Sequence, residues 1–243
     1  MDSSPPEPSP RPAPKQTPPL LVITADMLAN PAPPRETRLN FERGLSYAPK
    51  LALLLIGANV AMFLVELATD ALADSASIIR AGALHRESVL HGEVWRLISA
   101  MFLHAGFDHL LGNCLVLYIV GMACEHAVGW RTATVYFVGG LGGSMLSVVS
   151  SPGPSVGASG AIFGLAGGLI VFLYRHRDVF YVREKRTGVV LAAWAVYQLV
   201  IGLFLPFVDN FAHIGGLIGG AACMWPMKRR MTKEATGQAG LPK

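Results

Sequence analysis

The chain has 243 residues, of which 52% are hydrophobic and only 15% are charged, and its mean hydropathy is +0.43. Soluble domains carry about 25% charged residues, so this composition excludes an ordinary soluble protein and predicts an all-α protein that crosses a membrane several times. The net charge of +4 does not indicate nucleic-acid binding, because the basic residues lie between the apolar segments.

The first 49 residues hold twelve of the seventeen prolines and show little apolar periodicity. Such a segment cannot bury enough surface to offset the entropy of ordering. We therefore predict that residues 1–49 form a disordered Pro-rich tail.

Six apolar segments follow, each close to the ~20 residues that are needed to cross ~30 Å of hydrocarbon. Residues 50–228 should therefore form a bundle of six transmembrane helices, with 229–243 as a C-terminal tail. The six predicted spans are Leu51–Ala68, Phe107–Cys124, Ala133–Val149, Ser159–Tyr174, Gly188–Leu205 and Phe211–Met227.

Basic residues gather before the first predicted span, between the fourth and fifth, and after the sixth. Cytoplasmic loops carry an excess of Lys and Arg, so both termini are expected on the cytoplasmic side of a cell membrane, which we take to be a bacterial inner membrane. These residues are Lys50, Arg175, Arg177, Arg183, Lys185, Arg186, Lys228, Arg229 and Arg230.

Polar side chains occur at the external ends of three of the spans. The second span begins with His109 and Asn113, the fourth with Ser159 and the sixth with His213. With the N-terminus inside, all three spans run inward from the external face, so these residues share one depth. A polar residue inside a membrane is a functional-site hypothesis by default, and we expect an accessible cavity at this level.

Small residues recur at intervals of four in the fourth and sixth spans. Gly160 and Gly164 belong to one stripe, and Ala212, Gly216 and Gly220 to the other. Such stripes let two helix backbones approach closely. Pairing them would bring Ser159 within hydrogen-bonding range of His213.

A serine beside a histidine predicts acyl transfer, in which the imidazole takes the proton of the attacking hydroxyl. His109 and Asn113, spaced i and i+4, share one helix face and could donate hydrogen bonds to the developing oxyanion. Taken alone, Ser159 could instead be an N-cap and His213 a packing residue. Asp209 is interpreted as a cap of the sixth helix and not as a third catalytic group.

These motifs resemble those of the rhomboid intramembrane serine proteases. The matching segments, in chain order, are Gly92–Arg96 (GEVWR), His104–Asn113 (HAGFDHLLGN), Glu125, Gly157–Gly164 (GASGAIFG) and Ala212–Gly220 (AHIGGLIGG). The resemblance covers about 50–227, which is the whole predicted membrane domain.

The resemblance implies a Ser-His dyad of Ser159 and His213, with His109, Asn113 and the backbone N–H of Ser159 as oxyanion donors. It also implies that Phe163 packs against the base. Structural roles are expected for the remaining residues, namely Trp95, Arg96, His104, Glu125, Gly164, Gly216 and Gly220.

The expected function is that of a serine endopeptidase that cleaves transmembrane segments of membrane proteins near the external face, without cofactor, metal or nucleic acid. The alternative is a non-catalytic rhomboid-like protein, such as a derlin, that binds membrane clients; such a protein is expected to lack the serine or the histidine. A metal-dependent protease is disfavoured because there is no His-Glu-x-x-His motif. A transporter is disfavoured because the polar residues lie near one face and not at the midplane.

Overall fold

The computed structural model describes residues 41–42, 45–151, 153–180, 182–205 and 207–228. Most of the predicted Pro-rich tail (1–49) and all of the predicted C-terminal tail (229–243) lie outside these residues. The elements are α2 (Lys50–Ala68), α3 (Ser75–Ala81), α4 (Arg86–Leu90), α5 (Arg96–Ser99), η1 (Ala100–Phe102), α6 (Phe107–Val128), η2 (Gly129–Arg131), α7 (Thr132–Ser150), α8 (Ser159–Arg175), α9 (Val182–Gly202) and α10 (Asn210–Met224).

Every element in the described part of the chain is helical, and the only β pairing there is an isolated antiparallel bridge between Leu84 and Ser155. The predicted all-α class is confirmed. Because Ser155 precedes α8, the bridge ties the loop before that helix to the loop between α3 and α4.

Within the described residues, six long helices cover the six predicted apolar segments, and their ends differ from the predicted ones. The second continues to Val128 and the fifth begins at Val182, because backbone hydrogen bonding extends through polar residues beyond an apolar run. The short helices α3, α4 and α5 were not predicted, since each is too short to show a periodic pattern.

Two helical stretches of the described residues are long and apolar enough to cross a bilayer. One is α2, with a mean hydropathy of 2.2, and the other is the run Phe107–Ser150, with 1.5, which comprises α6, η2 and α7. The helix α8 is apolar but has 17 residues, and α10 has 15. The number of six spans therefore stays a prediction.

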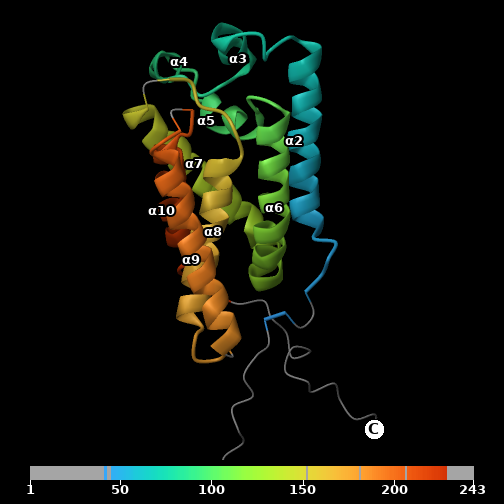
Figure 1. Ribbon diagram of the computed structural model, residues 1–243, viewed down its shortest axis with the longest axis vertical. Helices are drawn as coiled ribbons and strands as arrows, with labels where there is room; N and C mark the ends of the chain where they lie inside the picture. Colours follow the sequence, from blue (N-terminus) through green and yellow to red (C-terminus); the bar gives the residue numbers. More distant parts are fainter. Residues whose placement is uncertain (1–40, 43–44, 152, 181, 206, 229–243) are drawn as a thin grey trace, which may run out of the picture. The chain divides into compact units, whose positions relative to one another are not determined.

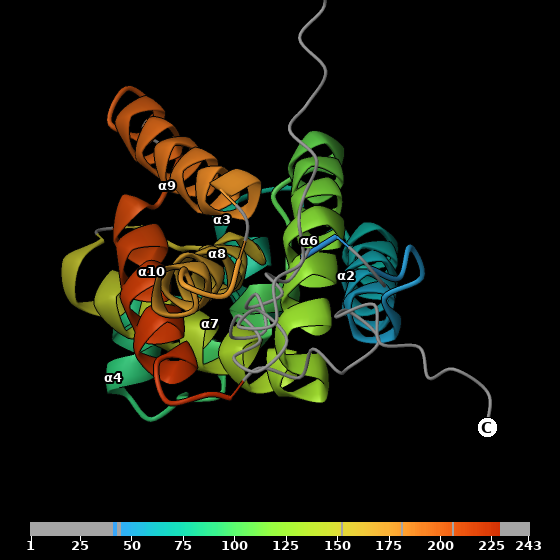
Figure 2. The same cartoon turned by 90° about the horizontal axis from the view of Figure 1, so that it is seen from below.

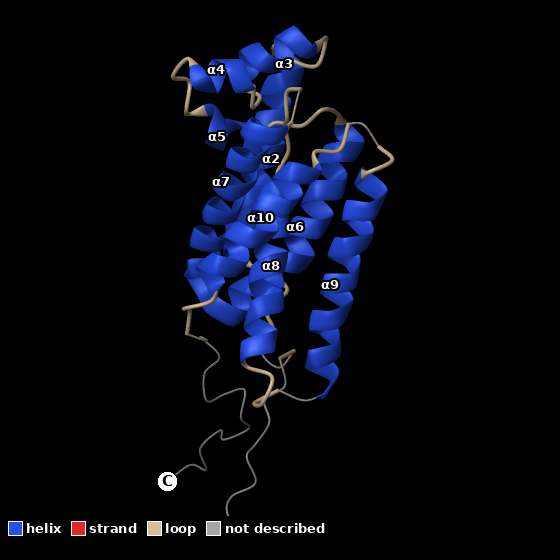
Figure 3. Cartoon of the chain, turned by 90° about the vertical axis from the view of Figure 1, so that its left-hand side faces the viewer, coloured by secondary structure: helices blue, strands red, loops and turns tan. Residues whose placement is uncertain are grey.

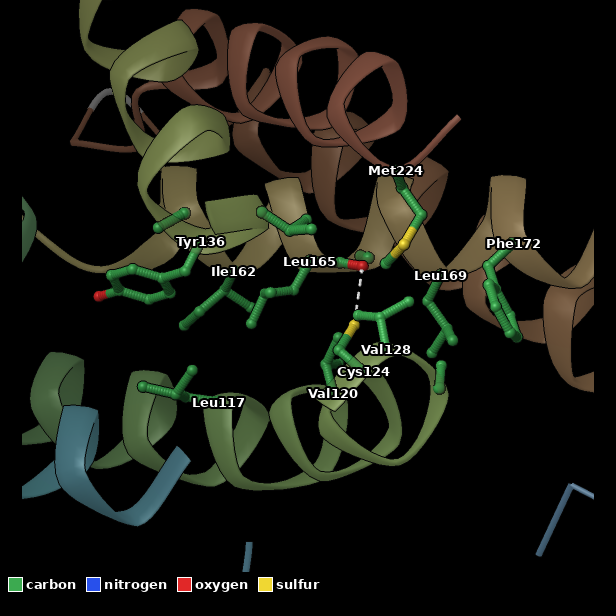
Figure 4. Packing of buried hydrophobic residues seen from close by; sticks show 14 of the residues in the cluster. Leu117, Val120, Cys124, Val128, Tyr136, Ile162, Leu165, Leu169, Phe172 and Met224 are labelled. Carbon is green, nitrogen blue, oxygen red and sulfur yellow. Dashed lines mark hydrogen bonds between the residues drawn. The ribbon is translucent and has the colours of Figure 1, made fainter. Parts of the chain in front are cut away.

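The helix α8 lies at the centre of the bundle and packs against α6, α7, α9 and α10, as the end-on view of Figure 2 shows. Helices α8 and α6 pack together in an apolar core, to which α8 contributes Ile162 and Leu165 and α6 contributes Leu117 (Figure 4). Within this core the Cys124 thiol donates to the Leu165 carbonyl at 3.4 Å. Helix α9 packs mainly on α8 and stands to one side in Figure 3.

The helices α3 and α4 lie at one end of the bundle, and the α8–α9 connection lies at the opposite end (Figure 1). Helices α6, α8 and α10 all begin toward the α3–α4 end. Their first turns are therefore at similar heights. This arrangement is the one expected if His109, Asn113, Ser159 and His213 form a single polar layer.

Candidate active site

A cavity of about 1110 Å³ opens where α6, α8 and α10 begin, and α9 contributes one wall. All four residues of the predicted polar layer line it: His109, Asn113, Ser159 and His213. Three helices that are distant in the sequence thus present their polar residues to one space.

Ser159 and His213 are hydrogen-bonded, with Nε2 of the imidazole 3.0 Å from the serine Oγ. Ser159 is the first residue of α8, and the N-cap position belongs to Ala158. The serine hydroxyl is therefore not the N-cap of this helix and is directed to the imidazole. His213 belongs to the first turns of α10 and is 7% exposed.

Glycines make this approach possible. A Cβ on Gly216 would collide with the carbonyl oxygen of Gly160, and one on Gly220 with that of Gly164. On the other side of α10, a Cβ on Gly143 of α7 would lie 2.6 Å from the carbonyl oxygen of Ala212. The backbones of α7, α8 and α10 are thus in direct contact, as small-residue stripes permit.

The imidazole of His213 stacks on the ring of Phe163, with centroids 4.2 Å apart and planes 4° from parallel. Phe163 in turn contacts Trp194 of α9 at 5.4 Å between ring centroids. The imidazole of His213 is therefore oriented by an aromatic surface that continues onto α9.

The other imidazole nitrogen of His213, Nδ1, is buried and has no hydrogen-bond partner among the described residues. The Asp209 carboxylate instead accepts from the backbone N–H of Ala212 at 3.0 Å and from the hydroxyls of Ser147 and Ser151. The prediction that Asp209 caps this helix is confirmed, and in this geometry it does not bind the imidazole.

The side chains of His109 and Asn113 lie next to Gly157, which is two residues before Ser159. Gly157 has φ +123°, and a Cβ there would lie 2.8 Å from His109 Nε2 and 3.4 Å from Asn113 Nδ2. Glycine is required at this position because an L side chain is strained at that φ and would fill the space. Asn113 Nδ2 has no partner among the described residues.

The ring of His109 accepts a hydrogen bond at Nδ1 from the backbone N–H of Ala105, at 3.4 Å. In a neutral ring this leaves the proton on Nε2, the nitrogen next to Gly157. Both His109 and Asn113 therefore have an N–H group available at the cavity.

His104 is fully buried and packs edge-on against His109, with ring centroids 5.2 Å apart. Its backbone N–H donates to both carboxylate oxygens of Glu66, at 2.9 and 3.2 Å. Burial lowers the pKa of His104 to about 4, so this ring is neutral. His104 supports His109 from outside the cavity.

Arg96 and Glu125 bind backbone and neighbouring side chains away from the cavity. Arg96 pairs with Glu93 at 2.6 Å, and its guanidinium donates to the carbonyls of Ile79 and Ala83 and stacks over Trp95. Glu125 accepts from the backbone N–H groups of Leu51 and Ala52 at the start of α2. These contacts order the loop after α3 and the beginning of α2.

Three residues of the site region were not predicted from the sequence. Trp194 and Gln198 of α9 line the cavity, and Glu66 anchors His104. Two signals in the sequence could have identified them. Trp194 and Gln198 are spaced i and i+4 on one helix, and Glu66 is an isolated acidic residue within an apolar span. Among the described residues no three His, Cys, Asp or Glu side chains gather closely enough to hold a metal ion.

Comparison with known proteins gives a consistent match. The family model described as "Rhomboid domain" matches residues 91–230, which is more than half of the chain. Rhomboid protease GluP of Bacillus subtilis (strain 168) is 36% identical over 173 residues, covering 71% of this chain and 34% of that protein.

Two relatives from Arabidopsis thaliana are also similar. RHOMBOID-like protein 5 is 44% identical over 144 residues, covering 57% of this chain and 46% of the relative. Inactive RHOMBOID-like protein 8 is 35% identical over 128 residues, which cover 52% of this chain and 36% of the relative. The chain therefore spans between about a third and a half of the length of these relatives.

Proposed function

The chain belongs to the rhomboid family, and we propose that it is an intramembrane serine endopeptidase with Ser159 as nucleophile and His213 as general base. The observation that carries this proposal is the hydrogen bond of 3.0 Å between the serine Oγ and the imidazole Nε2 in a cavity large enough for a peptide segment.

In the first step Ser159 Oγ attacks the carbonyl carbon of a substrate peptide bond while His213 Nε2 takes the hydroxyl proton. The resulting imidazolium then gives this proton to the leaving amine, and the C–N bond breaks. The first product leaves and an acyl ester remains on the serine. Water, deprotonated by His213, hydrolyses the ester and regenerates the hydroxyl.

The negative oxygen that forms during attack requires donors that are already in place. The Nε2–H of His109, the amide of Asn113 and the backbone N–H of Ser159 are the proposed donors. Support comes from the unpartnered Nδ2 of Asn113 and from the position of both side chains against Gly157.

The proposed substrates are transmembrane segments of membrane proteins, cleaved near the external face. In this proposal the six long helices all cross the bilayer and both termini are cytoplasmic, in a bacterial inner membrane. An intact substrate helix hides its carbonyls in hydrogen bonds, so cleavage is expected near helix ends, where carbonyls are free.

The decisive experiment compares the purified parent with Ser159→Ala and His213→Ala in detergent, using a single-span test substrate and a serine-reactive fluorophosphonate. We expect labelling of the parent at Ser159, none in Ser159→Ala, and a loss of more than about 10²-fold in His213→Ala, because general-base catalysis contributes roughly 10²–10⁴-fold. Ser159→Ala should keep the fold, since alanine suits the small-residue stripe.

One relative is named inactive, which keeps non-catalytic binding of membrane clients as the second candidate. That function would be indicated if the folded parent bound the test substrate but was neither labelled nor able to cleave it. Full cleavage by Ser159→Ala would reject the serine mechanism altogether.

A further inference from the structure

The charged side chains that line the active-site cavity all carry the same sign. Asp74, Asp108 and Asp209 contribute carboxylates, and the described residues of the cavity wall include no Lys or Arg. Asp74 lies just before α3 and Asp108 lies in the first turn of α6, and both are exposed. Asp209 is held by Ser147, Ser151 and Ala212.

The arginines of the same end of the bundle, Arg80, Arg86 and Arg96, do not line this cavity. Arg96 pairs with Glu93, and Arg86 donates to the carbonyl of Val149 at 3.3 Å. Arg80 lines a separate cavity of about 320 Å³ next to Glu66. The acidic lining of the large cavity is therefore not neutralised by cations in its own wall.

The cavity is also built to hold a ligand. Asn113 is 7% exposed, lines the same space, and its Nδ2 has no partner among the described residues. A buried amide without a partner is costly, and a substrate carbonyl would satisfy it. Asp108 and Asp74 are the exposed carboxylates of the wall of the same cavity, so a charged segment bound there would feel both of them.

The two exposed carboxylates, Asp74 and Asp108, should differ in how strongly they attract or repel a charged ligand. Asp74 caps α3 by accepting from the backbone N–H of Ser77 at 2.7 Å, and this bond holds its pKa below the usual range, with Arg80 adding to the effect. Asp74 is therefore ionised, but the nearby Arg80 cancels part of its field. Asp108 should exert the larger effect on a charged ligand.

On the basis of the proposed function, we infer that Asp108 and Asp74 make the protein selective for transmembrane segments that carry basic residues at their external end. Opposite charges at an exposed site attract, whereas an acidic flank is repelled by both carboxylates. The inferred substrate class is thus a spanning helix followed on the external side by Lys or Arg.

The test uses three versions of one single-span substrate, with Lys-Lys, Gln-Gln or Glu-Glu at the external end of the span, at an ionic strength of about 0.01 M, where the Debye length is ~30 Å. An exposed ion pair contributes about 1.4- to fivefold in affinity. We expect kcat/KM for the Lys version to exceed that for the Glu version by about tenfold, and the ratio to shrink toward one at about 1 M salt.

Asp108→Asn should bring the ratio of the two kcat/KM values close to one, and Asp74→Asn should lower it by less. Asparagine at position 74 still caps α3, so the fold there is kept. The matched control is Glu87→Gln, which removes an exposed carboxylate of α4 that does not line the cavity. It should leave the ratio unchanged. Asp108→Lys should invert the preference, so that the Glu version becomes the better substrate.

Binding to the inactive Ser159→Ala variant separates this inference from the proposed function. The Lys version should bind several times more tightly than the Glu version even though no bond is cleaved. Equal cleavage and equal binding of all three versions would overturn the inference while leaving the protease in place. A preference that survives the Asp74→Asn, Asp108→Asn double variant would overturn the assignment to these residues. Failure of fluorophosphonate labelling, with charge-dependent binding intact, would instead reject the proposed function alone.

Discussion

Two contacts position the imidazole ring of His213. Its Nε2 faces Ser159, its face lies on Phe163, and its Nδ1 has no partner among the described residues. A carboxylate that would fix the tautomer is not in contact, since Asp209 binds serines and the helix N-terminus. The orientation of the His213 imidazole therefore depends on ring stacking and on the position of α10.

Single substitutions can distinguish the proposed oxyanion donors, His109 and Asn113, from the proposed general base, His213, by the size of the loss in cleavage rate. His109→Ala and Asn113→Ala should each lower the cleavage rate by about 10²–10³-fold, because each removes one donor while the backbone N–H remains. His213→Ala should be more severe, since it removes the imidazole that is hydrogen-bonded to the Ser159 hydroxyl. The measurement is the initial cleavage rate at equal folded concentration.

The control for these two variants is Leu111→Ala, an exposed position of the same helix that does not line the cavity. It should retain the parent rate. If His109→Ala and Asn113→Ala also matched the parent, α6 would not stabilise the oxyanion.

At the scale of elements, α10 is enclosed by two glycine-rich helices. Its residues Gly216 and Gly220 face the carbonyls of Gly160 and Gly164 in α8, and Gly142 of α7 approaches Gly215 so closely that a Cβ would lie 2.8 Å from its carbonyl oxygen. A backbone contact of this kind sets the height of His213 relative to Ser159, because neither helix can shift without a collision.

Gly216→Val should therefore lower both activity and stability. The branched side chain must displace the Gly160 carbonyl, and overpacking of this kind costs about 1–3 kcal/mol, while a shift of about 1 Å at the reacting atoms can cost about 10²-fold in rate. Thermal unfolding and cleavage are measured on the same preparation.

Gly57→Val is the matched control for this variant, because a Cβ on Gly57 of α2 has nothing within 4 Å. Its melting temperature and rate should stay near those of the parent. Loss of activity in Gly216→Val at unchanged melting temperature would show that the contact does not support the bundle.

At the scale of the whole molecule, basic residues gather at the end of the bundle away from α3 and α4. Lys50 begins α2, and Arg175 and Arg177 precede α9 at the end away from α3 and α4 (Figure 1). The loops around α3 and α4 instead carry mixed charge. The excess of basic residues at one end supports the proposal that this end is cytoplasmic.

Reporter fusions test this orientation. Green fluorescent protein fused after Lys243 should fluoresce, whereas alkaline phosphatase fused at that position should be inactive, because each folds on only one side of a bacterial inner membrane. Phosphatase fused after Gly92 should be active. The opposite pattern would place both termini outside and contradict the orientation.

Much of the architecture was predictable from local patterns. Apolar runs located the six long helices, and the i, i+4 stripes of Gly160 and Gly216 predicted which helices touch, since both patterns follow from helix geometry alone. The residues of the polar layer could be named because Ser159, His213, His109 and Asn113 each interrupt an apolar segment at the same depth.

The chain sequence by itself determined the all-α class, the rhomboid resemblance and the candidate pair. Only the tertiary structure decided that Ser159 Oγ and His213 Nε2 are 3.0 Å apart, that Asp209 binds serines and not the imidazole, that Trp194 and Gln198 reach the cavity, and that Asp74 and Asp108 give it one sign of charge. These contacts join residues that are far apart in the chain, and their geometry depends on how whole helices pack. Local periodicity carries no information about a distance across that packing.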